Sequence, residues 1–245
     1  MTRRFRMIAG PNGSGKSTLT AWLMKDYAVN FYTMLNADNV FAQVKQTAAL
    51  FAPFPIDRKS LVSYVERTEY SKREKDRFRS GEIAVDADCI RFTRAEAVNS
   101  YAIALLVNFF QDECINRGIS FSQETVFSHP SKVAALEKAC LAGFRTYLYF
   151  VATDDVGINV DRVARRYAQG GHDVPPEKIQ ARYDRSLMNV PKALPYLSRA
   201  FFFDNSGEEM RYLACFSAER GLETHTPAEE LPRWFARHIL HCFQK

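Results

Sequence analysis

The chain has 245 residues, with 33 Lys and Arg against 28 Asp and Glu, which is a formal net charge of +5. Hydrophobic residues make up 47% and charged residues 25%, and these values exclude a wholly disordered chain, a collagen and a coiled coil. The longest nearly uninterrupted apolar run, residues 102–107 extended by Phe109 and Phe110, is far shorter than the roughly 20 residues of a membrane span. We therefore expect no membrane association. A mild positive charge suits an anionic substrate and is too weak to indicate nucleic-acid binding.

The N-terminal segment does not predict a signal peptide, because only three apolar residues separate Arg6 from Gly10-Pro11. The cysteines are odd in number and form no Cys-x-x-Cys pair. We read them as reduced thiols, which favours a cytoplasmic protein.

In the first half of the chain, a short apolar strand is expected over residues 5–9 and a helix over residues 17–24. A second strand is expected over residues 32–37. Residues 39–118 have a mainly helical and polar pattern, interrupted by Phe-Ala-Pro-Phe-Pro at residues 51–55. We interpret this region as a helical insertion on the acceptor side of a single domain that covers residues 1–245.

The second half alternates strands with helices. Asp154-Asp155 is expected to cap a helix through Ala168, which Gly170-Gly171 would end. Strands are expected over residues 119–121, 145–152, 200–203 and 221–224, and further helices over residues 132–141, after Val174-Pro175-Pro176, and over 231–243. Gly143 would end the helix over residues 132–141. This alternation predicts an α/β fold with a mostly parallel sheet flanked by helices.

A glycine-rich segment follows the first expected strand. Residues 10–17 match the pattern G-x-x-x-x-G-K-[S/T] of the P-loop NTPases. In that pattern backbone amides turn inward around a phosphate, Lys16 reaches the β- and γ-phosphates, and the Ser17 hydroxyl ligates Mg²⁺. We therefore predict that ATP or GTP binds with Mg²⁺ at Gly10, Pro11, Asn12, Gly13, Ser14, Gly15, Lys16, Ser17 and Thr18.

Two acidic residues come at the ends of expected strands, where ligands of α/β sheets bind. Asp38 follows residues 34–37, and Glu124 follows residues 119–123. Phosphoryl transfer to a hydroxyl needs a carboxylate that accepts its proton and a group that orients the acceptor or Mg²⁺. We assign Asp38 as the base and Glu124 as the orienting residue. The alternative for each is a helix cap, or for Glu124 also a surface charge.

An arginine-rich segment lies in the region of residues 154–190, which we interpret as a lid. Arg162 and Arg166 are four residues apart and share one helix face, and Arg182 follows further along. Fixed arginines can stabilise the charge on a transferring phosphoryl group, and a closing lid excludes water. A solvated basic helix is the alternative. His172 could contact phosphate or simply pack in a loop.

Taken together, these motifs resemble the zeta-toxin-like P-loop kinases. The matching pieces are the loop with its flanking residues, Asn36-Ala37-Asp38, Phe121 to Thr125, the segment from Asp161 to Tyr183 including Gly170-Gly171-His172-Asp173-Val174-Pro175, and Phe203 to Ser206. After Arg166 this chain departs from the zeta toxins best known as sugar-nucleotide kinases, which lack the Gly-Gly-His-x-Val-Pro stretch.

The resemblance implies a kinase that transfers the γ-phosphoryl group of ATP or GTP, with Mg²⁺, to a UDP-N-acetylamino-sugar such as UDP-N-acetylglucosamine. It implies a toxin of a toxin–antitoxin pair, whose antitoxin would be a separate chain. By motif, Lys16, Asp38, Arg166 and Arg182 would be catalytic, Arg162 would join the nucleotide site, and Asn36, Glu124 and Thr125 would bind the acceptor.

Two other functions remain open from the sequence. The chain could be a nucleotide-gated regulatory or binding ATPase that acts through a protein partner. It could also be a nucleic-acid end kinase that uses the same loop and base. Dependence of ATP consumption on an acceptor distinguishes a kinase from the regulatory ATPase, and strong salt dependence would mark nucleic-acid binding.

Overall fold

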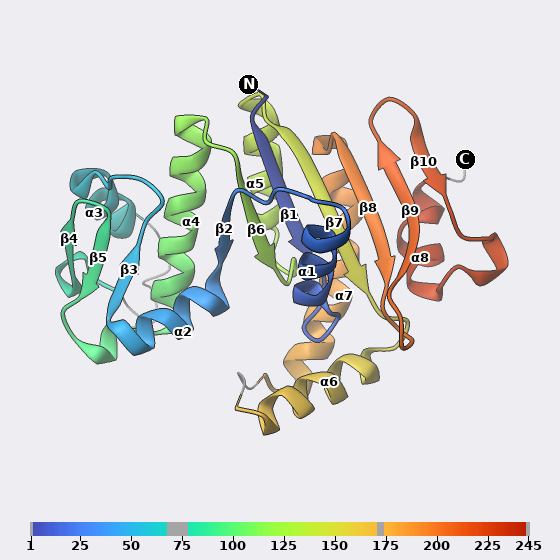
Figure 1. Cartoon of the computed structure of the whole chain (residues 1–245), viewed down its shortest axis with the longest axis horizontal. Coiled ribbons are helices and arrows are strands. Elements are labelled where there is room, and N and C mark those ends of the chain that lie inside the picture. Colours follow the sequence, from blue (N-terminus) through green and yellow to red (C-terminus); the bar gives the residue numbers. More distant parts are fainter. Residues whose placement is uncertain (1, 68–77, 171–173, 244–245) are drawn as a thin grey trace. The chain divides into compact units, whose positions relative to one another are not determined.

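The structure of the chain is a computed structural model that describes residues 2–67, 78–170 and 174–243 (Figure 1). It contains two compact units: one combines Met1–Tyr32 with Ser122–Lys245, and the other is Thr33–Phe121. The expected insertion over residues 39–118 falls within the second unit. The description of residues 1–245 as one domain stays a prediction.

The first unit is built on a sheet with the strand order β10-β9-β8-β7-β1-β6 (Figure 1). Strands β1, β7 and β8 are parallel neighbours, and β9 and β10 add an antiparallel hairpin beyond β8. The bounds are β1 (Arg4–Ala9), β6 (Phe121–Thr125), β7 (Arg145–Ala152), β8 (Arg199–Asp204), β9 (Arg211–Ser217) and β10 (Gly221–Thr224). The predicted α/β class with a mostly parallel sheet is confirmed.

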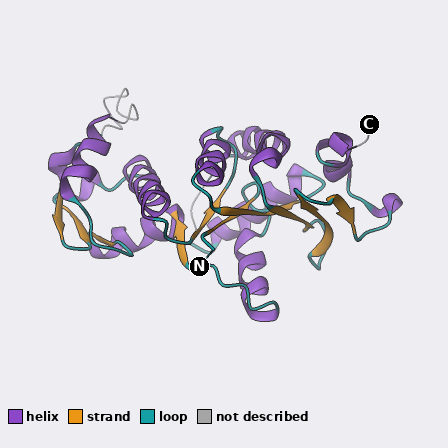
Figure 2. Ribbon diagram, turned by 90° about the horizontal axis from the view of Figure 1, so that it is seen from above, coloured by secondary structure: helices purple, strands orange, loops and turns teal. Residues whose placement is uncertain are grey.

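Helices cover both faces of this sheet, as Figure 2 shows. They are α1 (Lys16–Asp26), α5 (Ser131–Leu141), α6 (Val156–Ala168), α7 (Pro176–Ala193) and α8 (Arg233–His238), with 3-10 turns η5 (Leu194–Tyr196), η6 (Ala228–Glu230) and η7 (Leu240–Phe243). The core between helices and sheet includes Phe5, Met7, Phe150 and Phe202, each completely buried. Removal of these large apolar side chains from water is the main stabilising contribution.

The second unit combines helices with a small sheet of order β3-β5-β4. Its elements are β2 (Thr33–Asn36), α2 (Ala37–Thr47), β3 (Ala49–Phe51), α3 (Arg58–Arg67), η3 (Ser80–Glu82), β4 (Ile83–Asp86), β5 (Cys89–Phe92), η4 (Ala95–Ala97) and α4 (Ser100–Arg117). The expectation of a mainly helical region missed this antiparallel sheet. Its β4–β5 turn is Ala87-Asp88, with Ala87 at φ 49°, and lacks the Asn-Gly type of signal that identifies two-residue hairpins.

Local signals located several elements well. Strands β7 and β10 have the predicted bounds, Asp155 caps α6 by accepting a hydrogen bond from Gly157 N, and Gly143 follows α5 at φ 79°.

Two other expectations were wrong, and strand β9 was not predicted. The strand expected at residues 119–121 lies at Phe121–Thr125, because the polar residues Ser122 and Gln123 are buried in the sheet. The closing helix breaks at Ile239, whose side chain is fully buried and whose φ is −113°.

Candidate nucleotide site

The glycine-rich loop joins the C-terminal end of β1 to the N-terminus of α1, as the sequence predicted. Gly13 and Gly15 have φ values of 75° and 95°, which L side chains rarely adopt. A Cβ atom on Gly13 would lie 2.6 Å from Asn159 O, and one on Gly15 would lie 2.2 Å from Asn205 Nδ2. The loop therefore needs glycine at both positions, because atoms of Asn159 and Asn205 occupy the space that a Cβ atom would take.

Two asparagines from different segments of the chain form hydrogen bonds with the loop backbone. Asn159, fully buried on α6, donates from Nδ2 to Asn12 O at 2.6 Å, and its Oδ1 accepts a hydrogen bond from the Thr153 hydroxyl. Asn205, just after β8, donates from Nδ2 to Ser14 O at 2.9 Å. These bonds satisfy loop carbonyls that a turn leaves unpaired, and they fix the loop conformation from both sides.

The interior of the loop is suited to an anion. Lys16 Nζ donates to Gly10 O at 3.0 Å and to Pro11 O at 2.9 Å, so its ammonium group lies against the loop. The Ser14 hydroxyl is buried and has no hydrogen-bond partner among the described residues. The N-terminus of α1, with the positive end of its helix dipole, points to the same place. An anion such as a phosphate would satisfy these donors.

Ser17 and Glu124 meet at the start of α1. Ser17 Oγ donates to Glu124 Oε1 at 3.2 Å, and β6, which carries Glu124, is next to β1 in the sheet. A hydroxyl and a carboxylate oxygen at this separation are the hard oxygen ligands that Mg²⁺ prefers. The residues present thus fit the predicted Mg²⁺. Glu124 lies within β6 rather than after it, which corrects the expected placement and rules out a helix cap.

The predicted arginines differ in their surroundings. Arg182 Nη1 donates to Asn12 Oδ1 at 3.4 Å, so this α7 residue reaches the loop. Arg162 Nη1 donates to Asn205 O at 2.8 Å, which gives it a role in holding the segment after β8. Arg166, one turn further along α6, is exposed. A direct contact of Arg162 or Arg166 with nucleotide stays a prediction.

The predicted lid region, residues 154–190, contains α6 and most of α7, which pack through Val163, Val174 and Ile179. Residues 171–173, which include His172, lie outside the described residues.

From Tyr183 onward, α7 is bonded to the body of the first unit. The Tyr183 hydroxyl donates to Thr153 O, Ser186 Oγ donates to Val126 O at 2.6 Å, and Asn189 Nδ2 donates to Phe127 O at 2.9 Å. Burial raises the pKa of Tyr183, which keeps this donor protonated. These bonds anchor α7 to the first unit from Tyr183 onward.

The acceptor-side residues have the following local roles. Asn36 caps α2, with Oδ1 accepting from Asp38 N at 2.9 Å and from Asn39 N at 3.2 Å. Asp38 is exposed in the first helical turn, so the cap is Asn36 and not Asp38. Thr125 Oγ1 accepts from Phe127 N at 3.4 Å. The functional assignments of Asn36, Asp38 and Thr125 stay predictions.

Asn159 and Asn205 are site residues that were not predicted, although Asn205 lies in a segment that supported the resemblance. A signal existed for Asn159. It lies between Val156 and Val163 at three- and four-residue spacings, on the apolar face of α6. A buried amide in an apolar stripe needs a specific partner.

Comparison with known proteins gives structural neighbours only. No family model matches the chain, and no curated protein matches it. The AvrRxo1-ORF1:AvrRxo1-ORF2 complex with sulphate ions has a TM-score of 0.54 at 14% identity, over 91% of this chain and 61% of that one. The same complex with ATP has a TM-score of 0.54 at 13% identity, over 91% and 61%. This chain thus spans about 61% of the length of that neighbour.

A structure of the PezAT chromosomal toxin-antitoxin system of the human pathogen Streptococcus pneumoniae has a TM-score of 0.50 at 13% identity, over 85% of this chain and 72% of that one. At these identities the likeness shows a shared fold. In the described ranges, none of the helices combines the length and the hydropathy that a membrane crossing requires.

Proposed function

We propose that this chain is a phosphotransferase that moves the γ-phosphoryl group of ATP or GTP to a hydroxyl group of a small molecule. The proposal rests on the conformation of the glycine-rich loop. Hydrogen bonds from Asn159 and Asn205 hold this loop in place, and the contact between Ser17 and Glu124 follows it directly. A loop held this firmly is preorganised for a polyphosphate, and positioning is most of what phosphoryl transfer requires of a protein.

Each residue of the loop region has a distinct task in this proposal. Lys16 would leave the carbonyls of Gly10 and Pro11 to bind the β- and γ-phosphates. Ser17 and Glu124 would hold Mg²⁺, which when bound neutralises charge on the phosphate oxygens. Arg182, already at the loop, would stabilise charge on the transferring group. Arg166 would do so from α6 after closure.

For the acceptor we propose a UDP-N-acetylamino-sugar, with Asp38 taking the proton of the reacting hydroxyl and with Asn36, Glu124 and Thr125 on the acceptor side. This part rests on the sequence resemblance. One neighbour was solved with ATP, and another belongs to a toxin-antitoxin system. The ATP-bound neighbour agrees with the proposed nucleotide, and the toxin-antitoxin neighbour agrees with the further proposal that this chain is a toxin controlled by a separate antitoxin.

Mass spectrometry tests the proposal directly. The purified chain is incubated with Mg-ATP or Mg-GTP and a pool of nucleotide sugars, with Lys16→Ala as the inactive control. We expect one UDP-sugar to gain a phosphoryl group with the wild type only. The absence of any phosphorylated nucleotide sugar would contradict the UDP-sugar acceptor. Nucleotide consumption that no acceptor accelerates would contradict the kinase and favour the nucleotide-gated regulatory ATPase.

A matched pair of variants tests the base. Asp38→Asn should reduce transfer by about 100-fold or more, within the range general base catalysis contributes, while nucleotide binding stays within about twofold. Asp88→Asn, at an exposed turn of the same unit, is the control and should retain full activity. An equal loss of binding and transfer in Asp38→Asn would contradict the assignment.

A further inference from the structure

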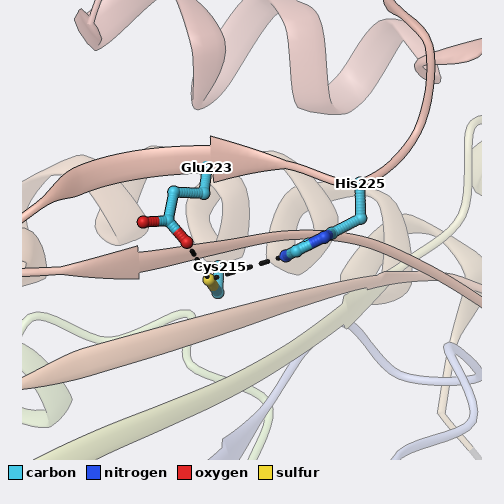
Figure 3. Close-up of side chains that lie close together, drawn as sticks. All are labelled: Cys215, Glu223 and His225. Atoms are coloured by element: carbon cyan, nitrogen blue, oxygen red, sulfur yellow. Dashed lines mark hydrogen bonds between the residues drawn. The ribbon is translucent and has the colours of Figure 1, made fainter.

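Three side chains with metal-binding atoms converge on the β9–β10 hairpin (Figure 3). Cys215 on β9 is directly opposite Glu223 on β10, and His225 follows β10 by one residue. Cys215 Sγ lies 3.7 Å from Glu223 Oε2 and 3.7 Å from His225 Nε2. The three ligand atoms all lie within 4.8 Å of one another. Among the described residues, no other three His, Cys, Asp or Glu side chains bring their ligand atoms this close together.

We propose that Cys215, Glu223 and His225 bind a zinc-class divalent cation. Zinc is bound by thiolate, imidazole and carboxylate at about 2.3, 2.0 and 2.1 Å in tetrahedral geometry, so neighbouring ligand atoms lie roughly 3.4–3.6 Å apart. The separations of Cys215 Sγ from Glu223 Oε2 and from His225 Nε2, 3.7 Å each, match these ligand–ligand distances to about 0.2 Å. Mg²⁺ and Ca²⁺ are disfavoured because sulfur and nitrogen are poor ligands for hard cations. With three protein ligands, water would complete the tetrahedron.

The surrounding contacts orient these ligands. The His225 ring stacks on Tyr212, with centroids 4.9 Å apart and an interplanar angle of 24°. The His225 backbone is fixed by donation of its N–H to Leu213 O at 2.8 Å. Arg220 Nη1 lies 3.6 Å from Glu223 Oε1, which leaves Oε2 facing the thiol. Such outer contacts hold metal ligands in place and raise affinity.

The site is distinct from the nucleotide loop. That loop follows β1, whereas β9 and β10 lie beyond β7 and β8 at the edge of the sheet. The ion would link β10 to β9 and stabilise the short edge hairpin. We therefore expect bound Zn²⁺ to stabilise the hairpin, with one coordination position left to water. Binding would release the Cys215 thiol proton to solvent, so affinity should fall as the pH is lowered.

The test uses the full chain, stripped with a chelator and titrated with Zn²⁺ alone by calorimetry, and separately with Co²⁺. We expect one Zn²⁺ per chain, a thermal midpoint that rises with free Zn²⁺, and a thiolate-to-cobalt charge-transfer band. Cys215→Ser and His225→Gln should each weaken Zn²⁺ binding by about 100-fold or more. Glu223→Gln provides a third variant if either of these fails to fold by circular dichroism.

Cys242→Ser with His241→Gln is the matched control, because these residues near the C-terminus are the same two types and are exposed. The control should bind Zn²⁺ as tightly as the wild type. The proposal is overturned if the wild type binds no Zn²⁺, if Cys215→Ser keeps wild-type affinity, or if the control loses binding.

Discussion

Substitution of Asn159 tests whether a hydrogen bond from α6 holds the glycine-rich loop in its conformation. In Asn159→Ala, Asn12 O loses the donor that now lies at 2.6 Å. The Thr153 hydroxyl also loses its bond to Asn159, but it can still donate to Asp155 O at 3.2 Å. The substitution therefore leaves one buried backbone carbonyl without its partner, in the loop itself.

The expected magnitude follows from that single carbonyl. An unsatisfied buried acceptor lowers the free energy of unfolding by about 1–3 kcal/mol, so we expect a loss of about 2 kcal/mol. If the bond holds the loop in its binding conformation, the same free energy also opposes nucleotide binding. A loss of about 2 kcal/mol corresponds to a rise of up to about 30-fold in the Kd for ATP.

Two measurements check this prediction: denaturant unfolding for stability and calorimetric titration for the Kd of Mg-ATP. Thr146→Val is the matched control. Thr146 is fully buried near the start of β7, and its hydroxyl donates a hydrogen bond to Tyr196 O. Because β1 and β7 are parallel and the loop follows the end of β1, Thr146 lies at the opposite end of the sheet from the loop. It should lose similar stability and keep the wild-type Kd. If Asn159→Ala also kept the wild-type Kd, the reasoning would be refuted.

Three further predictions concern other positions. Gly15→Ala should abolish nucleotide binding, because its Cβ would lie 2.2 Å from Asn205 Nδ2 at a φ of 95°, and titration with ATP measures the loss. Burial, aided by Arg237, lowers the pKa of His238 below 6.5, so the unfolded chain takes up this proton first and stability falls as the pH drops below 6.5. His238→Gln should make that fall shallower in unfolding curves. Burial raises the pKa of Cys114 to about 12, so iodoacetamide should label exposed Cys242 in the native protein and leave Cys114 unmodified until unfolding.

The sequence alone predicted the elements whose signals are local. Strand β7 is rich in β-branched and aromatic residues, Asp155 precedes its helix, and the glycine loop is a contiguous pattern between a strand and a helix. Strand β9 was missed because its two buried residues, Leu213 and Ala214, are adjacent, so its sequence does not alternate apolar and polar residues as a typical strand does. The small β3-β5-β4 sheet was missed because its strands have three or four residues each.

By itself the sequence determined the α/β class and the position of the glycine-rich loop, because both follow from residues close together along the chain. Only the tertiary structure showed what holds the loop. Asn159 and Asn205 bond to residues 147 and 191 positions away, and no local pattern encodes a contact at that separation. The cluster of Cys215, Glu223 and His225 likewise depends on the register of β9 against β10, which places Cys215 opposite Glu223. A shift of one residue would turn the thiol to the other face of the sheet.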